Sequence, residues 1–354
     1  MRKTPFQSAS PRFLVLAILA AASATCRAQP ADADGQQQFA DLGNCKLVSG
    51  QEITGCRLGY RIWGKLNAER SNAVLFPSWL AGTTAQLRYA VSADGLVDPA
   101  KYYVIAVDAL GDGVSSSPSN SATQHGPDFP AFTIQDMVNA EYRMLTEKLG
   151  LRHLHAVVGI SMGAHQAFEW MADYPSFMSI AIPILGSPRP NSRDLLLHFA
   201  YEDAIRSDPA WQHGRYAKAP PAAAAEILIQ MNLTTPANYA RTHPLEQFAA
   251  IYNGYLATGI LPFDANDLLA QVNAIIHLDV AHGGSLADAA KHVKARVLVV
   301  SAAQDHIVNP QPALDFAALI GAKTLVLQGD CGHNANNCEA NTLNPAVRAF
   351  LDGQ

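Results

Sequence analysis

Short apolar runs alternate with amphipathic stretches along most of the chain. Continuous apolar runs at residues 102–108, 154–159 and 177–185 are typical of parallel strands that are buried on both faces. The stretch 133–149, and a second one that ends near Ala172, have the apolar spacing of helices. Strands and helices therefore alternate, which predicts an α/β fold with a mostly parallel central sheet and helices on both faces.

Turn and capping residues mark the ends of these elements. Thr133 is placed to cap a helix, Asp136 completes a capping box, and Gly150 ends that helix. Glycines and an Asn-rich turn separate further strand-like segments. Additional strands are predicted at 45–48, 56–63, 73–76, 295–301 and 323–328, and additional helices at 311–320 and 345–351.

The alternation stops between residues 187 and 291. This part of the chain is Ala-rich and helical without a strong strand pattern, and 219–225 (APPAAAA) has the composition of a connector. We interpret residues 189–290 as an inserted helical cap. The α/β core is then expected at 45–188 and 291–354, after a polar N-terminal leader at 29–44.

The N-terminus has the pattern of a secretory signal. Three basic residues precede or flank an apolar and small-residue run at 13–25, which is too short for a comfortable membrane span. A signal peptide at 1–28 with cleavage after Ala28 is predicted, so the protein is expected to be periplasmic or secreted. Cys26 leaves a lipoprotein as one alternative, and a buried N-terminal helix is another.

Composition narrows the class of protein. Apolar residues make up 49% of the chain and charged residues 16%, with a formal net charge of −5 and no basic cluster in the body of the chain. These values argue against a disordered chain and against a protein that binds the phosphates of nucleic acid electrostatically. A multi-span membrane protein is not expected either, because only the N-terminal run is long enough to consider.

The strongest chemical motif is Gly159-Ile160-Ser161-Met162-Gly163. It fits G-x-S-x-G and lies between a predicted strand and a predicted helix, which is the context that this motif requires. A strained turn lifts the serine hydroxyl above the sheet, flanking glycines let the backbone pass closely, and the helix N-terminus favours developing negative charge. Ser161 is therefore the predicted nucleophile, and an ordinary turn with a capping serine is the alternative.

A serine nucleophile needs a base, and the base needs an acid that orients it. His333 follows the last predicted strand and Asp305 follows the strand before it, so both are expected at the carboxyl edge of the sheet beside Ser161. Asp330 and Asp108 are alternative acids. We favour Asp305, because the chain order Ser, Asp, His is typical of hydrolases that carry this strand–turn–helix motif.

Two backbone N–H groups are needed to stabilise the oxyanion. Met162 follows the nucleophile and Leu80 lies in the loop after the strand at 73–76, so these are the predicted donors, with Trp79 as the next candidate. His165 lies one turn after the nucleophile and is a pocket candidate. The alternative for it is a packing histidine held by hydrogen bonds.

Four cysteines remain after the predicted cleavage, which suggests two disulfides in an oxidising compartment. Their spacing favours the local pairs Cys45–Cys56 and Cys331–Cys338, although four cysteines allow three connectivities. The second bridge would bracket His333 and preorganise the base. A zinc site at Cys331, His333 and Cys338 matches no standard ligand spacing, so no metal is predicted, and unpaired thiols are the remaining alternative.

The segment 132–175 resembles the homoserine O-acetyltransferase family of α/β-hydrolases. That family has a T-I-x-D-M-V helix start, a G-G-S-M-G-G-M-Q elbow and an E-W pair before Y-P, which read here TIQDMV, GISMGAHQ, EW and YP. Segments 64–73 and 305–310 and the pair at 332–333 also fit family patterns. The resemblance implies an α/β-hydrolase core with a helical cap and the catalytic and oxyanion residues named above. It is also compatible with a homodimer that forms through the cap helices.

Several departures from that family bear on the substrate. The family's His-x-Leu-Thr-Gly loop appears as Ser-Trp-Leu-Ala-Gly at 78–82, and its terminal Gly-His-Asp appears as Gly-His-Asn at 332–334. The family has a cap arginine that pairs with the homoserine carboxylate, whereas this chain has Glu202 there, or Arg206 after a one-turn shift. An acid at that position would repel a carboxylate. The family's acetyl-CoA chemistry is cytosolic, whereas this chain is predicted to be exported.

These observations predict an exported serine hydrolase that cleaves an ester or related small-molecule acyl substrate through an acyl-enzyme, without a cofactor. One alternative is an acyltransferase of the homoserine O-acetyltransferase type, in which an alcohol acceptor replaces water. A non-catalytic binding protein on a hydrolase scaffold is a third. The acyl group, the leaving group and the oligomeric state stay open, because the cap decides specificity and carries no readable motif.

Overall fold

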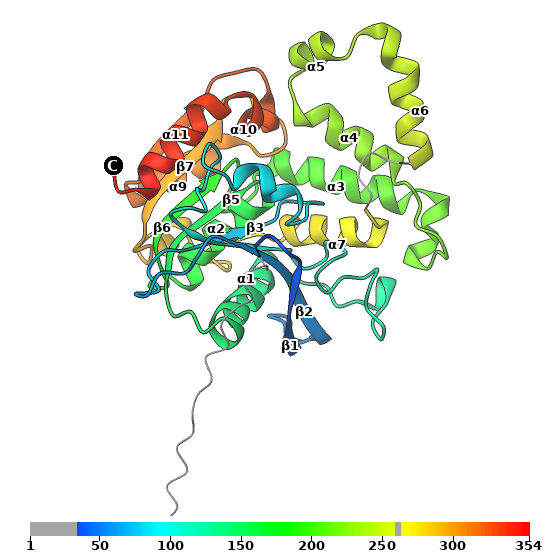
Figure 1. The fold of residues 1–354 in the computed structure, drawn as a ribbon. Helices are drawn as coiled ribbons and strands as arrows, with labels where there is room; N and C mark the ends of the chain where they lie inside the picture. Colours follow the sequence, from blue (N-terminus) through cyan, green and yellow to red (C-terminus); the bar gives the residue numbers. More distant parts are fainter. Residues whose placement is uncertain (1–33, 259–262) are drawn as a thin grey trace, which may run out of the picture. The chain divides into compact units, whose positions relative to one another are not determined.

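Eight strands form one mixed sheet in the computed structural model, which describes residues 34–258 and 263–354. The strand order is β1-β2-β4-β3-β5-β6-β7-β8, with antiparallel pairs at β1–β2 and β2–β4 and parallel pairs from there to β8 (Figure 1). The predicted mostly parallel sheet is confirmed. The strands are β1 (Gln38–Lys46), β2 (Glu52–Trp63), β3 (Ala73–Pro77), β4 (Tyr103–Val107), β5 (Leu154–Ile160), β6 (Met178–Ile184), β7 (Arg296–Ala302) and β8 (Lys323–Leu327).

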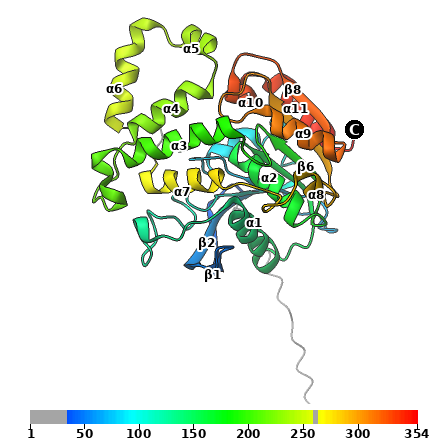
Figure 2. The same cartoon turned by 180° about the vertical axis from the view of Figure 1, so that it is seen from behind.

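Helices cover both faces of the sheet, as Figures 1 and 2 show from opposite sides. Helices α1, α2, α8 and α9 share one apolar core with the sheet, and α11 contributes to a second core on the opposite face. The helices are α1 (Ile134–Arg143), α2 (Met162–Asp173), α3 (Ser192–Arg206), α4 (Ala223–Leu233), α5 (Pro236–Thr242), α6 (Phe248–Thr258), α7 (Ala265–Ile276), α8 (Leu286–Ala290), α9 (Pro310–Ile320), α10 (Ala335–Cys338) and α11 (Ala340–Leu351).

The first strand departs from its prediction. The leader expected at 29–44 is already strand from Gln38 onward, because β1 pairs with β2 along its length. Its polar residues are the exposed positions of an edge strand and alternate with buried Ala40 and Leu42, a pattern that reads as a loop when the partner strand is unknown. The signal peptide predicted at 1–28 lies outside the described residues.

Helix α1 begins as predicted and changes form before its expected end. The Thr133 hydroxyl accepts from the backbone N–H of Asp136, whose carboxylate accepts from the backbone N–H of Thr133, so the capping box is present. From Met144 to Lys148 the backbone makes a π-helical turn, and the chain leaves it at Gly150 with φ +62°.

The connection between β6 and β7 is a helical insertion, as predicted. Helices α3, α4 and α7 share an apolar core of their own, which includes Tyr201 and Leu268. The same core contains Ala81, Ile307 and Val308, which belong to loops at the carboxyl edge of the sheet. The insertion therefore packs directly against the loops expected to carry chemistry. Helix α8 falls inside the range predicted for the cap, yet it packs with the sheet core.

The structure pairs the four described cysteines as the spacing favours. The sulfur atoms of Cys45 and Cys56 lie 2.02 Å apart and join β1 to β2. Those of Cys331 and Cys338 lie 2.05 Å apart and close the segment that contains His333. Because both thiols flanking His333 are used in this bridge, they are not ligands for a zinc ion.

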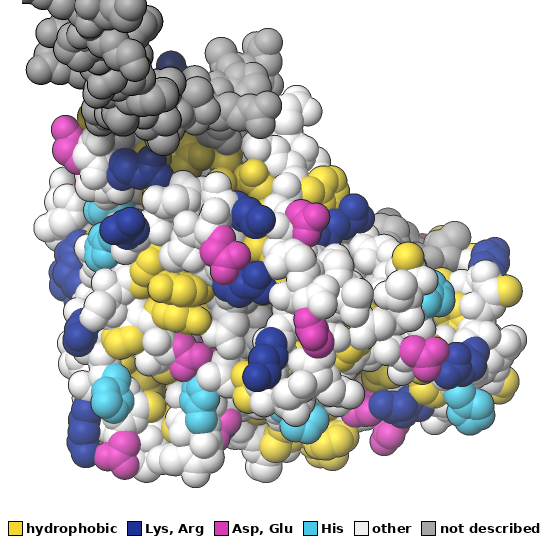
Figure 3. Space-filling view, turned by 90° about the horizontal axis from the view of Figure 1, so that it is seen from below, with side chains coloured by type: hydrophobic (Ala, Val, Ile, Leu, Met, Phe, Trp, Pro, Cys, Tyr) yellow, Lys and Arg dark blue, Asp and Glu magenta, His cyan; other side chains and the backbone are white. Residues whose placement is uncertain are grey.

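The surface mixes charges of both signs. On the face drawn in Figure 3, basic and acidic side chains are interspersed and not gathered by sign. Within residues 34–258 and 263–354, no helix combines the length and the apolar character that crossing a membrane requires.

Candidate active site

Ser161 lies in the tight turn between β5 and α2. Its backbone has φ +56° and ψ −120°, a conformation that residues other than glycine rarely adopt. A Cβ on Gly159 would lie 2.0 Å from the carbonyl oxygen of Gly163, and a Cβ on Gly163 would lie 2.5 Å from that of Pro77. Glycine is thus required at both flanks, and α2 begins at Met162, next to the hydroxyl.

His333 and Asp305 form a hydrogen-bonded chain with Ser161. Nδ1 of the imidazole lies 2.7 Å from Oδ2 of Asp305, and Nε2 lies 2.8 Å from Oγ of Ser161. Because a carboxylate can only accept, Nδ1 carries the ring proton, and Nε2 of the neutral ring accepts from the serine hydroxyl. The side chains of His333 and Asp305 are only 8% and 1% exposed, so this chain is shielded from water.

The backbone of its own loop holds the Asp305 carboxylate in place. Oδ1 accepts from the N–H groups of Ile307 at 2.9 Å and Val308 at 3.0 Å. These two bonds fix the plane of the carboxylate and leave Oδ2 directed at the imidazole. Asp305 is therefore built as an orienting group for the histidine.

The two alternative acids have other partners. Asp108 is fully buried and accepts from the backbone N–H of Thr84 at 2.6 Å. Asp330 is paired with Arg241 at 2.9 Å on the surface. The acid that contacts the histidine is Asp305, the one favoured by chain order.

The helical insertion ties down both loops that meet Ser161. The guanidinium of Arg193 on α3 donates to the carbonyl oxygen of His306 at 2.6 Å, next to the acid. The hydroxyl of Thr235, which caps α5, donates to the carbonyl oxygen of Asp330 at 2.7 Å, close to the histidine. These contacts join chain segments that are far apart in sequence, and they make the site a product of core and insertion together.

Two backbone N–H groups are available for an oxyanion. Met162 is the first residue of α2, and Leu80 lies in the loop after β3. Among the described residues, neither N–H donates a hydrogen bond. Their roles as oxyanion donors stay predictions.

Gln271, on α7 of the insertion, holds the loop that carries Leu80. Its Oε1 accepts from the N–H of Ala81 at 2.9 Å, and its Nε2 donates to the carbonyl oxygen of Leu110 at 3.1 Å. The Gln271 side chain is fully buried. The backbone of Ala81 has φ +58°, so its bond to Gln271 holds Ala81 in a strained conformation. Sequence reasoning missed Gln271, because a glutamine 190 residues from its partner leaves no local pattern.

His165 is buried and held by the backbone. Its Nδ1 lies 3.0 Å from both the backbone nitrogen and the carbonyl oxygen of Ser187. Burial lowers the pKa of His165 to about 3, so the ring is neutral at physiological pH. This environment matches the packing histidine that was its alternative assignment.

Of the remaining pocket candidates, Glu202 and Arg206 lie on α3, and Trp79 lies in the loop after β3. Glu202 and Arg206 are paired with each other on α3, with Nε of Arg206 donating to Glu202 at 2.7 Å. Arg206 also lines a cavity of about 550 Å³ with Trp211, and Ser161, His333 and Asp305 do not line it. Trp79 packs against Tyr89, with ring centroids 6.3 Å apart.

Two buried residues of α3 near the site carry no sequence signal. The pKa of His198 is lowered to about 4, mainly by burial and to a smaller extent by the charge of His333. The hydroxyl of Tyr201 is buried and has no hydrogen-bond partner among the described residues. Both side chains lie inside the insertion, whose sequence pattern indicates only helices.

Known proteins are similar to this chain over most of its length. Residues 74–336 match the sequence profile of the alpha/beta hydrolase fold family. An ethyl acetate hydrolase of Pseudomonas veronii is 32% identical over 299 residues, covering 81% of this chain and 85% of its own. A homoserine O-acetyltransferase of Zymomonas mobilis is 31% identical over 355 residues, covering 88% and 95%. The solved structure of the acetyl esterase MekB has a TM-score of 0.83 at 30% identity and covers 90% of this chain and 97% of its own. The resemblance noted in the sequence is confirmed.

Proposed function

The chain belongs to the alpha/beta hydrolase fold family, and from this premise we propose that it is an exported serine esterase that hydrolyses small acyl esters. The observation that carries the proposal is the hydrogen-bonded chain from Asp305 through His333 to Ser161. Relatives named ethyl acetate hydrolase and acetyl esterase support ester hydrolysis and a short acyl group.

The proposed reaction begins when Oγ of Ser161 attacks the ester carbonyl carbon and its proton passes to Nε2 of His333. Asp305 stabilises the resulting imidazolium, and the N–H groups of Leu80 and Met162 stabilise the oxyanion. The tetrahedral intermediate then collapses, the ester C–O bond breaks, and the alcohol leaves with the proton from Nε2. Water gives its proton to the same nitrogen while it attacks the acyl-enzyme, which releases the acid and restores the serine.

Hydrolysis is favoured over transfer to homoserine by the charges on α3. A transferase of the homoserine O-acetyltransferase family, which this chain resembles, needs an arginine that binds the carboxylate of its acceptor. Here Arg206 is paired with Glu202 at 2.7 Å, so its charge is already matched. A second carboxylate would have to compete with Glu202 for Arg206, which disfavours homoserine as an acceptor.

Export is supported by two features of the chain. The N-terminal residues have the charge and hydropathy pattern of a signal peptide. The two disulfides, Cys45–Cys56 and Cys331–Cys338, suit an oxidising compartment. Detection of the processed protein in a periplasmic or culture fraction, against retention of a variant that lacks residues 1–28, would test this part of the proposal.

Turnover of p-nitrophenyl acetate and ethyl acetate, with and without homoserine, tests the activity. We expect hydrolysis that homoserine leaves unchanged, and acetate as the product by mass. Formation of O-acetyl-homoserine would instead identify a transferase, the alternative supported by the relative from Zymomonas mobilis.

A fluorophosphonate probe separates both enzymes from a non-catalytic binding protein. We expect one label per chain on Ser161 and none in Ser161→Ala. The matched control is Ser176→Ala, an exposed serine that accepts a hydrogen bond from Lys294. A folded wild-type protein that takes up no label would overturn the enzymatic proposal.

A further inference from the structure

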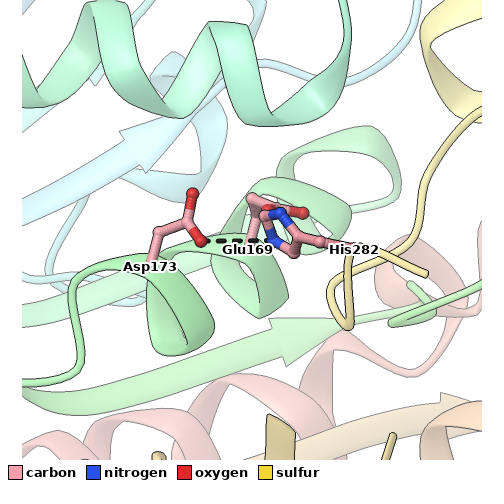
Figure 4. Close-up of side chains that lie close together, drawn as sticks. All are labelled: Glu169, Asp173 and His282. Atoms are coloured by element: carbon pink, nitrogen blue, oxygen red, sulfur yellow. Dashed lines mark ion pairs between the residues drawn. The ribbon is translucent and has the colours of Figure 1, made fainter. Parts of the chain in front are cut away.

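A second cluster of chemically active side chains lies on the part of α2 farther from Ser161. Glu169 and Asp173 are four residues apart on α2, so they lie on the same face of the helix. His282 reaches them from the turn that precedes α8. Its Nε2 lies 2.9 Å from Oε1 of Glu169 and 3.2 Å from Oδ1 of Asp173, and the three side chains converge in Figure 4.

The contact between Glu169 and His282 is close without being a hydrogen bond. The Glu169 side chain is only 2% exposed, and its Oε1 has no hydrogen-bond donor among the described residues. A buried carboxylate oxygen normally has a donor, because leaving it unpaired is costly. Glu169 is thus a buried acid whose Oε1 meets His282 at ion-pair distance and accepts no hydrogen bond among the described residues.

The spacing of the three side chains is that of ligands around one ion. When metal–ligand bonds are about 2.0–2.2 Å long, neighbouring ligand atoms in a tetrahedral or octahedral site lie about 2.9–3.5 Å apart. The two separations to Nε2 of His282, 2.9 Å and 3.2 Å, fall in this range. Each of the three residues offers a ligand atom within 4.8 Å of the others.

The surroundings hold more negative than positive charge. The carboxylates of Asp173, Asp279 and Asp136 are close enough to that of Glu169 to repel a negative charge on it. Arg189 is already paired with Asp279 at 2.5 Å. A divalent cation would compensate this excess.

A second layer of contacts orients the predicted ligands. Nε2 of Gln135 donates to Oδ2 of Asp173 at 2.9 Å, which leaves Oδ1 directed at the cluster. Asp279 accepts from the N–H of Gly283 at 2.9 Å and so holds the turn in which His282 has φ +50°. Such outer contacts are typical of metal sites, where they fix the direction of each ligand.

We propose that Glu169, Asp173 and His282 bind a divalent transition-metal ion such as Zn²⁺. One imidazole and two carboxylates are a ligand set that suits this ion, and a cavity of about 340 Å³ lined by Glu169 and His282 has room for water at the remaining positions. The ion would join α2 to the turn before α8. This site is separate from the chain of Ser161, so the proposal does not depend on the proposed function.

Calorimetric titration of the chelator-treated full chain with ZnCl₂, in a buffer that does not bind metal, tests the site. We expect one saturable site in the wild type that is weakened by at least about tenfold in both Asp173→Asn and His282→Ala. His277→Ala is the matched control, because His277 lines the same cavity and is not one of the three ligands. The control should bind like the wild type.

Thermal unfolding gives a second reading that does not rely on heat of binding. Zn²⁺ should raise the Tm of the wild type and of His277→Ala and should raise that of both ligand variants clearly less at the same concentration. Circular dichroism should confirm that each variant is folded without metal. Absence of a saturable site in the wild type, or wild-type binding in both ligand variants, would overturn the proposal. Preferential binding of Mg²⁺ or Ca²⁺ would overturn the assignment to a transition metal.

Discussion

Replacing Asp305 by asparagine tests the hydrogen-bonded chain with almost no change in side-chain volume. Oδ1 of Asp305 accepts from the N–H groups of Ile307 and Val308, so the amide oxygen of asparagine must occupy that position. Its NH₂ group then faces Nδ1 of His333 in place of Oδ2. Because this group only donates, Nδ1 must accept, and the ring proton moves to Nε2, where it blocks proton transfer from Ser161.

The expected loss follows from this change of tautomer. We expect kcat/KM for p-nitrophenyl acetate to fall about 10⁴-fold, the effect seen when a triad histidine is held in the wrong tautomer, which corresponds to about 5 kcal/mol in activation free energy. The free energy of unfolding should change little, because the two backbone N–H groups keep their acceptor. Steady-state kinetics and urea unfolding of the same preparation measure both quantities.

Asp330→Asn is the matched control for this experiment. It makes the same chemical change three residues before His333, at a surface acid that is paired with Arg241. Exposed ion pairs contribute little, so the turnover of this variant should stay within about twofold of the wild type. A folded Asp305→Asn enzyme whose kcat/KM lies within about tenfold of the wild type would refute the role assigned to Asp305.

Three further predictions concern the supporting structure. Gln271→Leu leaves the N–H of Ala81 and the carbonyl of Leu110 without partners, so it should lower the free energy of unfolding in urea by about 2–5 kcal/mol. It should also reduce kcat more than it changes KM, and an unchanged kcat would contradict the positioning role. Cys338→Ser should cost about 2–3 kcal/mol and lower turnover, and unaltered turnover would leave the bridge with stability alone. Burial raises the pKa of Glu141 to about 8. The protonated Glu141 therefore contributes its full stability below its unfolded pKa, and this stability is lost as pH rises through about 8. Urea unfolding should show that the wild type loses free energy of unfolding on the order of a few kcal/mol between about pH 5 and pH 9, and that Glu141→Gln does not show this loss. Equal pH dependence in both proteins would be inconsistent with this.

Much of the fold could be predicted because its signals are local. The buried parallel strands are continuous apolar runs. The start of α1 is marked by Thr133 and Asp136, which form the reciprocal hydrogen bonds of a capping box. The edge strand β1 was placed too late, because an exposed edge strand alternates polar and apolar residues and its strand character depends on the pairing with β2.

The candidate site divides in the same way. Ser161 was predictable because its turn needs glycines at neighbouring positions, which is a requirement of a few adjacent residues. His333 and Asp305 were predictable from chain order, since parallel strands end at one edge of the sheet. Gln271 and the cluster around His282 were not, because their partners are distant in sequence and only the path of the insertion brings them together.

The strands, the tight turn at Ser161 and the helix caps could be predicted from the sequence alone, because steric and hydrogen-bonding rules between near neighbours determine them. Tertiary packing decided which acid contacts the imidazole, what holds the loop that carries Leu80, and whether Arg206 is free. In each case the outcome depends on side chains from separate elements that meet only after α3 and α7 have packed over the edge of the sheet. Such contacts depend on the shape of the whole core, and no short window of residues encodes that shape.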